Sequence, residues 1–213
     1  AKIGFPSKVK PINIFPNPIL KFSIDTTSIE NSLAIAKDYA KEADWFEAEH
    51  YGQSLTSFFS DGTKNYLGIK DSNLAHEIIN AARCYLDGIG WHENADLVME
   101  SWLNLNPYST WHGAHEHFDS LMSGVVWLQT NQDSGAHFVF IEPNSVKTQI
   151  FLQYSDVKLK DNEFNRSTYT INPKSGEGVI FPSWMTHQVL PNKSKEYRYS
   201  IAFNIWIDKN GKN

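Results

Sequence analysis

The sequence predicts a mainly β domain, a sandwich or barrel, with helices in its N-terminal part. The first observation is a change of period: apolar residues recur at helical spacing up to about residue 90, whereas from Ala95 they alternate with polar residues. The second is that the alternating segments are short and are separated by turn signals containing proline, glycine and asparagine, which is typical of sandwiches and barrels. Two helices ahead of such a barrel would cover one of its outer faces.

Two amphipathic helices are expected, at residues 28–43 and 74–86, because their apolar residues recur at helical spacing. Hydroxyl and amide side chains just before or within each first turn could accept hydrogen bonds from its free N–H groups. The expected N-caps are Thr27 or Ser28, and Ser72 or Asn73. Residues 12–24 are extended and interrupted by prolines, so they can form an edge strand at best.

Strands are expected after residue 95, wherever apolar and β-branched residues alternate or cluster between turns. They cover residues 97–105, 125–128, 137–141, 169–171, 178–181 and 199–207. Residues 144–168 are polar, and we expect them to form a lid or loop beside the functional site.

Length and charge restrict the class of protein. The 213 residues suit one domain, 1–213, with helical support at 25–90 and a β-barrel core at 95–208. The net charge of -5 does not favour nucleic acid, and no apolar run approaches the ~20 residues of a membrane span. Cys84 is the only cysteine, which excludes an intramolecular disulfide and fits a cytoplasmic location. A small-molecule or protein side-chain substrate and a homodimer are compatible with these features.

Clustered histidines are the strongest chemical signal. His112, His115 and His117 fall in one six-residue window, and His187 follows 70 residues after His117. Side chains at i and i+2 of an extended strand share a face, so His115 and His117 can reach one metal ion. His187 comes after the strand expected at 178–181, which places it at the mouth of a barrel. Imidazole ligands suit Fe(II), among other metals. Three protein groups on one face of this ion would leave three positions for other ligands.

Two ligand sets are compatible with this spacing. One is His115, His117 and His187, which leaves residues 118–120 for a turn before the next strand. The other has Asp119 in place of His115, which completes the usual combination of two histidines and one carboxylate. We favour the first set. Glu116 is expected to point to the opposite face and is a poor ligand.

Arg198 follows His187 by eleven residues and lies in the last expected strand. A guanidinium can bind a carboxylate through two parallel hydrogen bonds. Ser200 lies two residues further on, on the same strand face, and could add a hydroxyl donor. Asn104 could face the same site or the solvent, and nearby aromatic residues could line it. These are Trp102, Tyr108, Trp111, Trp127 and Trp184.

Seven segments form a combination of motifs: residues 14–18 (IFPNP), 101–106 (SWLNLN), 115–128 (HEHFDSLMSGVVWL), 134–135 (SG), 140–143 (FIEP), 178–191 (GVIFPSWMTHQVLP) and 198–204 (RYSIAFN). Together they resemble a family of 2-oxoglutarate/Fe(II)-dependent oxygenases found in marine bacteria and cyanophages. Any one of these motifs alone would be weak, but the combination is specific. Phe118 stands where the family often has proline, and Val126-Trp127 where it has two tyrosines.

The resemblance implies a double-stranded β-helix, a jelly-roll or cupin-like barrel, with the metal at its open end. It implies Fe(II) as cofactor and 2-oxoglutarate and O2 as co-substrates, with a hydroxylated product, succinate and CO2. It also implies His115, His117 and His187 as metal ligands, with Arg198 and Ser200 binding the far carboxylate of 2-oxoglutarate. One alternative is a metal-binding, cupin-like barrel that does not use 2-oxoglutarate. Another is a metal-free interaction module, in which the histidines would lie apart.

Overall fold

The computed structural model describes residues 12, 14–43, 45–47, 52, 54–58, 64–91, 94–131, 134–158, 160 and 162–208. The two ends of the expected domain 1–213, and parts of the expected helical support and barrel core, lie outside the described residues.

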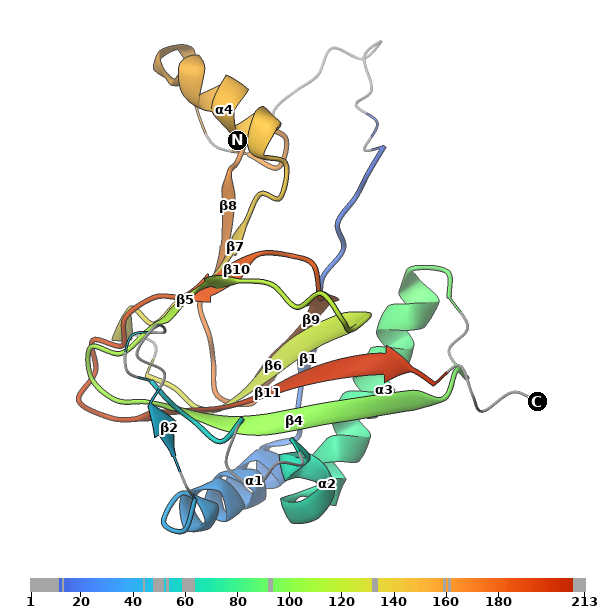
Figure 1. Ribbon diagram of the computed structural model, residues 1–213, viewed down its shortest axis with the longest axis vertical. Helices are drawn as coiled ribbons and strands as arrows, with labels where there is room; N and C mark the ends of the chain where they lie inside the picture. Colours follow the sequence, from blue (N-terminus) through green and yellow to red (C-terminus); the bar gives the residue numbers. More distant parts are fainter. Residues whose placement is uncertain are drawn as a thin grey trace.

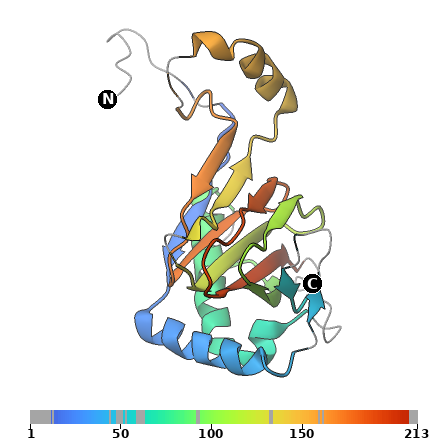
Figure 2. The same ribbon diagram turned by 90° about the vertical axis from the view of Figure 1, so that its left-hand side faces the viewer.

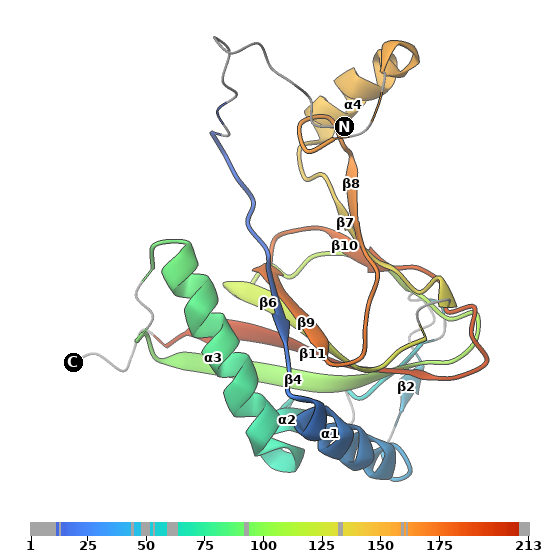
Figure 3. The same cartoon turned by 180° about the vertical axis from the view of Figure 1, so that it is seen from behind.

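Three helices lie against one side of the β-structure, which Figure 3 shows from the helical side. They are α1 (Thr26–Tyr39), α2 (Tyr66–Lys70) and α3 (Ser72–Gly88). The expected ends were partly wrong: the first helix stops before residue 43, and the second is longer than 74–86 at both ends. Within the described part of the chain, no helix has both the length and the apolar character needed to cross a membrane.

The caps of α1 and α3 differ from those expected, because an aspartate directly precedes each of these two helices. Asp25 accepts hydrogen bonds from the backbone N–H groups of Thr27 and Ser28. Asp71 accepts one from Leu74, at 3.1 Å. A carboxylate is as good an N-cap as a hydroxyl, and it also carries negative charge to the positive end of the helix dipole.

A seven-stranded sheet forms the larger layer, in the order β1-β9-β6-β11-β4-β3-β2. Its strands are β1 (Leu20–Ser23), β2 (Phe46–Glu47), β3 (Leu55–Thr56), β4 (Leu97–Asn106), β6 (Met122–Gln129), β9 (Glu177–Pro182) and β11 (Arg198–Ile207). All neighbouring pairs are antiparallel. β1 is an edge strand, as expected for the segment 12–24, whose prolines lie just before β1. β1, β2 and β3 all precede residue 95, so the sheet is not confined to 95–208.

A four-stranded antiparallel sheet lies across from the first, in the order β5-β10-β7-β8. Its strands are β5 (His112–His115), β7 (Phe138–Ile141), β8 (Thr168–Ile171) and β10 (His187–Val189). In Figure 1 this sheet lies above the large sheet, and the loops at the left of the picture connect the two layers. The protein is therefore a mainly β structure with the double-stranded β-helix fold, as the resemblance implied.

Strict alternation along the central strands divides the apolar residues between two cores. On β6, Val126 and Leu128 pack with the helices, whereas Val125 and Trp127 point between the two sheets. On β11, Ile201 and its alternate neighbours pack with the helices. The opposite face of β11, which carries Ser200, is thereby turned into the space between the sheets, where it lines a cavity. Because the helices cover one face of the large sheet, only the opposite face can line a site between the two sheets.

Residues 144–168 contain more regular structure than the loop that the sequence suggested. They include helix α4 (Ser145–Gln153), none of whose residues is buried, and the 3-10 helix η3 (Ser155–Val157). Figure 2 shows α4 beyond the ends of β7 and β8, standing off the barrel. No residue of the described part of this segment lines the cavity between the sheets. The structure therefore does not show it as a lid.

The close approach of β6 to its neighbours leads to a stability prediction. A Cβ atom on Gly124 would lie 2.5 Å from the carbonyl oxygen of Val179 and would overlap the ring of Phe203. Gly124→Ala should therefore lower the free energy of unfolding by about 1–3 kcal/mol, the usual cost of overpacking. Gly88→Ala is the matched control, because nothing lies within 4 Å of its Cβ position and alanine favours a helix. Urea unfolding of both variants tests this; equal stabilities would contradict it.

Candidate active site

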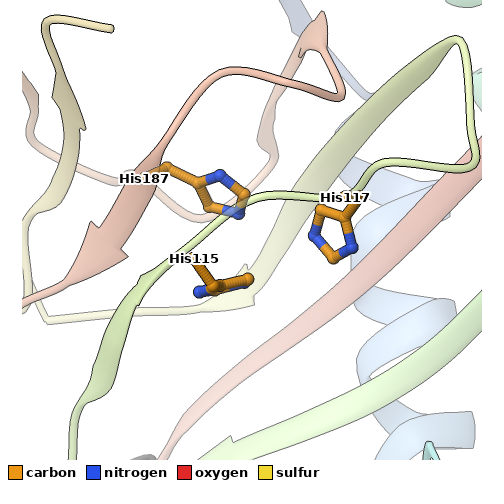
Figure 4. A group of neighbouring side chains, drawn as sticks. All are labelled: His115, His117 and His187. Carbon is orange, nitrogen blue, oxygen red and sulfur yellow. The ribbon is translucent and has the colours of Figure 1, made fainter.

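Three histidines meet where the small sheet faces the large one. His115 ends β5, and His187 begins β10 as its register partner on the neighbouring strand. His117 lies two residues beyond β5, where its backbone N–H donates to the carbonyl of Ser183 at 2.9 Å. Figure 4 shows the three rings gathered around one point. One ligand atom from each lies within 4.8 Å of the other two. A metal-free module in which the histidines lie apart does not match this geometry.

Hydrogen bonds orient two of the three rings. His115 Nδ1–H donates to the carbonyl of Gly113 at 2.7 Å, and His187 Nδ1–H donates to that of Met185 at 2.9 Å. In each ring the Nε2 lone pair then remains for a metal, which is the usual arrangement of a histidine ligand.

Burial keeps these imidazoles neutral. It lowers the pKa of His115, lowers that of His117 to about 4 and holds that of His187 well below its ordinary value. The neighbouring histidines add to this effect at His117 and His187. A metal ion needs the neutral form of the ring, so the site is ready to bind one at neutral pH. The residues present fit a divalent iron centre with open positions.

Neither acidic residue of this segment joins the histidine group. Asp119 is exposed, and its backbone carbonyl accepts a hydrogen bond from the indole N–H of Trp206. Glu116 was expected to face away, but it lines the cavity and accepts a hydrogen bond from the Thr186 hydroxyl at 3.0 Å. The expectation was wrong because β5 ends at His115, and alternation of faces does not extend beyond a strand.

A hydroxyl chain that the sequence reasoning missed holds the turn beside His117. Ser120 donates to Ser183 at 2.7 Å, Ser183 and Ser123 share a hydrogen bond of 2.9 Å, and Ser123 donates to Asn204 at 2.7 Å. Ser183 also receives the backbone N–H of His117, so this chain fixes the segment that follows β5. Single serines in separate loops and strands give no sequence signal for such a chain.

The histidines line one part of a cavity of about 290 Å³ between the two sheets. Five further aromatic residues line it: Phe138 comes from β7 of the small sheet, whereas the others lie on or next to strands of the large sheet. These are Phe46, Phe58, Trp102 and Phe181. Of the five aromatic residues considered from the sequence, Trp102 and Trp127 line the cavity. Tyr108, Trp111 and Trp184 are exposed.

Arg198 lines the same cavity and is 3% exposed. Its Nη1 donates to the carbonyl of Ala136 at 3.1 Å and its Nη2 to Oδ1 of Asn106 at 2.8 Å, while its Nε has no hydrogen-bond partner. No carboxylate of the described chain forms an ion pair with it. Burial lowers its pKa to about 10, so it stays charged at neutral pH. A buried cation without a counter-charge is costly, and an anion in the cavity would remove that cost.

His112 was part of the sequence cluster but is not in the metal-binding group. It lines the cavity, and its pKa is lowered to about 3, first by burial and then by the charge of Arg198 and by His115. It is therefore a neutral imidazole that is electrostatically coupled both to Arg198 and to the metal-binding group. The sequence placed His112 in the histidine cluster, but spacing alone did not show that it would lie outside the metal-binding group.

A double-stranded β-helix with three neutral imidazoles and a buried cation in one cavity is the arrangement expected of a metal-dependent oxygenase that uses an oxo acid. Residues 100–204 match the family model described as "Putative 2OG-Fe(II) oxygenase". This segment carries both the histidines and Arg198, and the match supports the family of 2-oxoglutarate/Fe(II)-dependent oxygenases. The protein is thus an oxygenase with Fe(II) as cofactor and 2-oxoglutarate and O2 as co-substrates. The match argues against the cupin-like alternative without 2-oxoglutarate.

Solved structures show the same fold at low sequence identity. A prolyl-4-hydroxylase from Pseudomonas putida superposes with a TM-score of 0.62 at 14% identity, covering 90% of this chain and 93% of its own. A prolyl hydroxylase from Trichoplax adhaerens, in complex with a hypoxia inducible factor peptide, gives 0.62 at 10% identity, with 91% and 85% covered. HygX from Streptomyces hygroscopicus, with nickel and 2-oxoglutarate bound, gives 0.58 at 10% identity, with 91% and 84% covered. None of the curated proteins compared matches the sequence.

Proposed function

We propose that the protein hydroxylates a small molecule or a protein side chain while it converts 2-oxoglutarate and O2 to succinate and CO2. One oxygen atom of O2 enters the product alcohol and the other enters succinate, so the reaction needs no further reductant. His115, His117 and His187 would hold Fe(II), which supplies the activation of O2 that side chains cannot perform. Arg198 and Ser200 would bind the far carboxylate of 2-oxoglutarate.

The observation that carries this proposal is the uncompensated charge of Arg198 in the cavity that the histidines share. Its Nε lacks a partner, and no described carboxylate pairs with it. A dicarboxylate with an oxo group at one end suits both the histidine group and Arg198. Its oxo acid end would chelate the metal, and its far carboxylate would accept hydrogen bonds from the guanidinium. Ser200 is buried and faces the same cavity.

The rest of the cavity supports an organic substrate of modest size. Aromatic rings of Phe46, Phe58 and Trp102 line its large-sheet side, and Glu116 adds a carboxylate near His115. Rings of this kind provide apolar contact area for a side chain or small metabolite.

We also propose a cytoplasmic location. We further propose an origin in the marine bacterial and cyanophage branch, and this second proposal rests on the motifs in residues 101–204.

Succinate formation tests the proposal. The purified protein, loaded anaerobically with Fe(II), is mixed with 2-oxoglutarate and O2 and screened against proline-containing peptides and small metabolites. We expect at least one substrate to stimulate succinate release in step with its own gain of one oxygen atom. Iron-free protein and His187→Ala provide the background. The absence of both turnover and 2-oxoglutarate binding in the iron-loaded protein would contradict the proposed function.

A further inference from the structure

A row of polar side chains crosses three adjacent strands on the cavity face of the large sheet. Ser200 on β11 lies opposite Asn104 on β4 and opposite Trp127 on β6. Residues directly opposite each other in neighbouring strands point to the same side of a sheet. All three line the cavity and all three are buried. Arg198 lies two residues from Ser200, on the same face of β11, so this row borders the buried cation.

The indole N–H of Trp127 is the unexplained member of the row. Trp127 is 0% exposed, and its Nε1 has no hydrogen-bond partner among the described atoms. An indole can donate but cannot accept a hydrogen bond. Leaving a buried donor unsatisfied costs free energy, so buried Trp N–H groups normally have a partner. Because Trp127 lines the cavity, an acceptor bound in the cavity can satisfy this N–H.

Packing holds the ring of Trp127 in place. It meets Phe138 edge-to-face with the ring centroids 6.0 Å apart, and it belongs to the apolar cluster between the two sheets. A ring held in this way offers its N–H in one fixed direction, which reduces the entropy lost when a ligand binds. Phenylalanine would fill most of the same space without leaving a buried donor, so packing alone does not account for tryptophan here.

We propose that the indole N–H of Trp127 donates a hydrogen bond to the far carboxylate of 2-oxoglutarate, beside the guanidinium of Arg198. The inference rests on the proposed function and adds a residue to the co-substrate site. The far carboxylate then accepts hydrogen bonds from the charged guanidinium of Arg198 on β11 and from the neutral indole N–H of Trp127 on β6. Because a methyl group at this end could not accept the hydrogen bond, the residue contributes to the selection of a dicarboxylate over an oxo acid with an apolar tail.

The test compares two ligands that differ only at the far end. 2-Oxopentanoate has the five-carbon chain of 2-oxoglutarate, with a methyl group in place of the far carboxylate. Affinities are measured by calorimetry on protein loaded with Zn(II), which accepts nitrogen ligands and does not turn over. Trp127→Phe should weaken 2-oxoglutarate binding by about ten- to a hundredfold, the range for a hydrogen bond to a charged group, and leave 2-oxopentanoate binding unchanged.

Trp91→Phe is the matched control, since Trp91 is half exposed at the end of α3 and does not line the cavity. It should change neither affinity. If Trp127→Phe weakens both ligands equally, Trp127 only shapes the cavity and the inference is wrong. If it weakens neither, the hydrogen bond does not exist. If the wild-type protein itself fails to bind 2-oxoglutarate, the fault lies with the proposed function instead.

A second measurement needs no substitution and so does not depend on the folding of a variant. The chain has seven tryptophans, whose indole N–H signals can be observed separately by NMR after 15N labelling. Adding 2-oxoglutarate to the Zn(II)-loaded protein should shift one buried indole N–H signal downfield, and 2-oxopentanoate should not produce this shift. An indole spectrum that responds identically to both ligands would refute the hydrogen bond.

Discussion

Replacing His187 by alanine should abolish iron binding, with a loss of metal affinity well beyond the roughly hundredfold that follows when only a residue supporting a ligand is changed. His187 is buried and comes from β10, on the other side of the metal-binding point from the segment that carries His115 and His117. Without it, two imidazoles from one short segment remain, which is too few to hold Fe(II) on one face. Iron content after anaerobic loading and gel filtration measures the effect.

Asp119→Asn is the matched control for the ligand set. The Asp119 side chain is exposed and lies outside the histidine group, so this variant should retain full iron occupancy. His115→Ala should instead lose the metal, like His187→Ala. The opposite pattern, in which His115→Ala keeps iron and Asp119→Asn loses it, would establish the alternative set with Asp119 in place of His115. Full iron occupancy in His187→Ala would show that the triad is incorrect. Thermal unfolding of each variant without metal separates loss of ligand from loss of fold.

Alternation of apolar residues predicted the central strands well, because each is packed on both faces and therefore has a strict period. On β4, Leu103 and Leu105 pack toward the helices while Asn104 faces the cavity, as a period of two requires. The short strands β5 and β10 have too few residues to show a period. Their positions follow from pairing with each other, which no local pattern reveals.

The errors in the sequence reasoning arose where strand periodicity stops or where several residues compete for one role. Glu116 lies one residue beyond β5, where the alternation of faces no longer applies, and it lines the cavity. Asp25 and Asp71 are the N-cap residues, whereas the sequence favoured the hydroxyl and amide residues next to them. Helix α4 has no buried residue. Its sequence therefore needs no apolar stripe, and without such a stripe the helix could not be predicted from periodicity.

The candidate site was predictable in its residues but not in its electrostatics. Spacing and motifs selected the histidines and Arg198, but they did not show whether the Arg198 side chain faces the solvent or the interior. That choice depends on Asn106 and Ala136, which are far from Arg198 in sequence and accept its hydrogen bonds. The unpartnered N–H of Trp127 is likewise a property of the packed structure, because sequence does not show which donors lack acceptors.

Arg198→Met should lower the affinity for 2-oxoglutarate by about a hundredfold or more and leave metal binding intact. Truncating one partner of a buried, hydrogen-bonded charge pair typically costs about 2–5 kcal/mol, and here the other partner would be the far carboxylate of the ligand. Methionine fills much of the same space without charge. Arg198 is not a member of the histidine group, so iron content should match that of the wild type.

The affinity of the Zn(II)-loaded variant for 2-oxoglutarate, measured by calorimetry, gives the result directly. Arg198→Lys is the graded control: it keeps a positive charge but loses the planar fork, so its affinity should lie between those of the wild type and the methionine variant. 2-Oxopentanoate should bind the wild type weakly, and Arg198→Met should not weaken it further, because its methyl end offers nothing to a guanidinium. Undiminished 2-oxoglutarate binding by a folded Arg198→Met protein would show that the buried cation serves the architecture of β4 and β11, where Asn106 holds it, rather than the co-substrate.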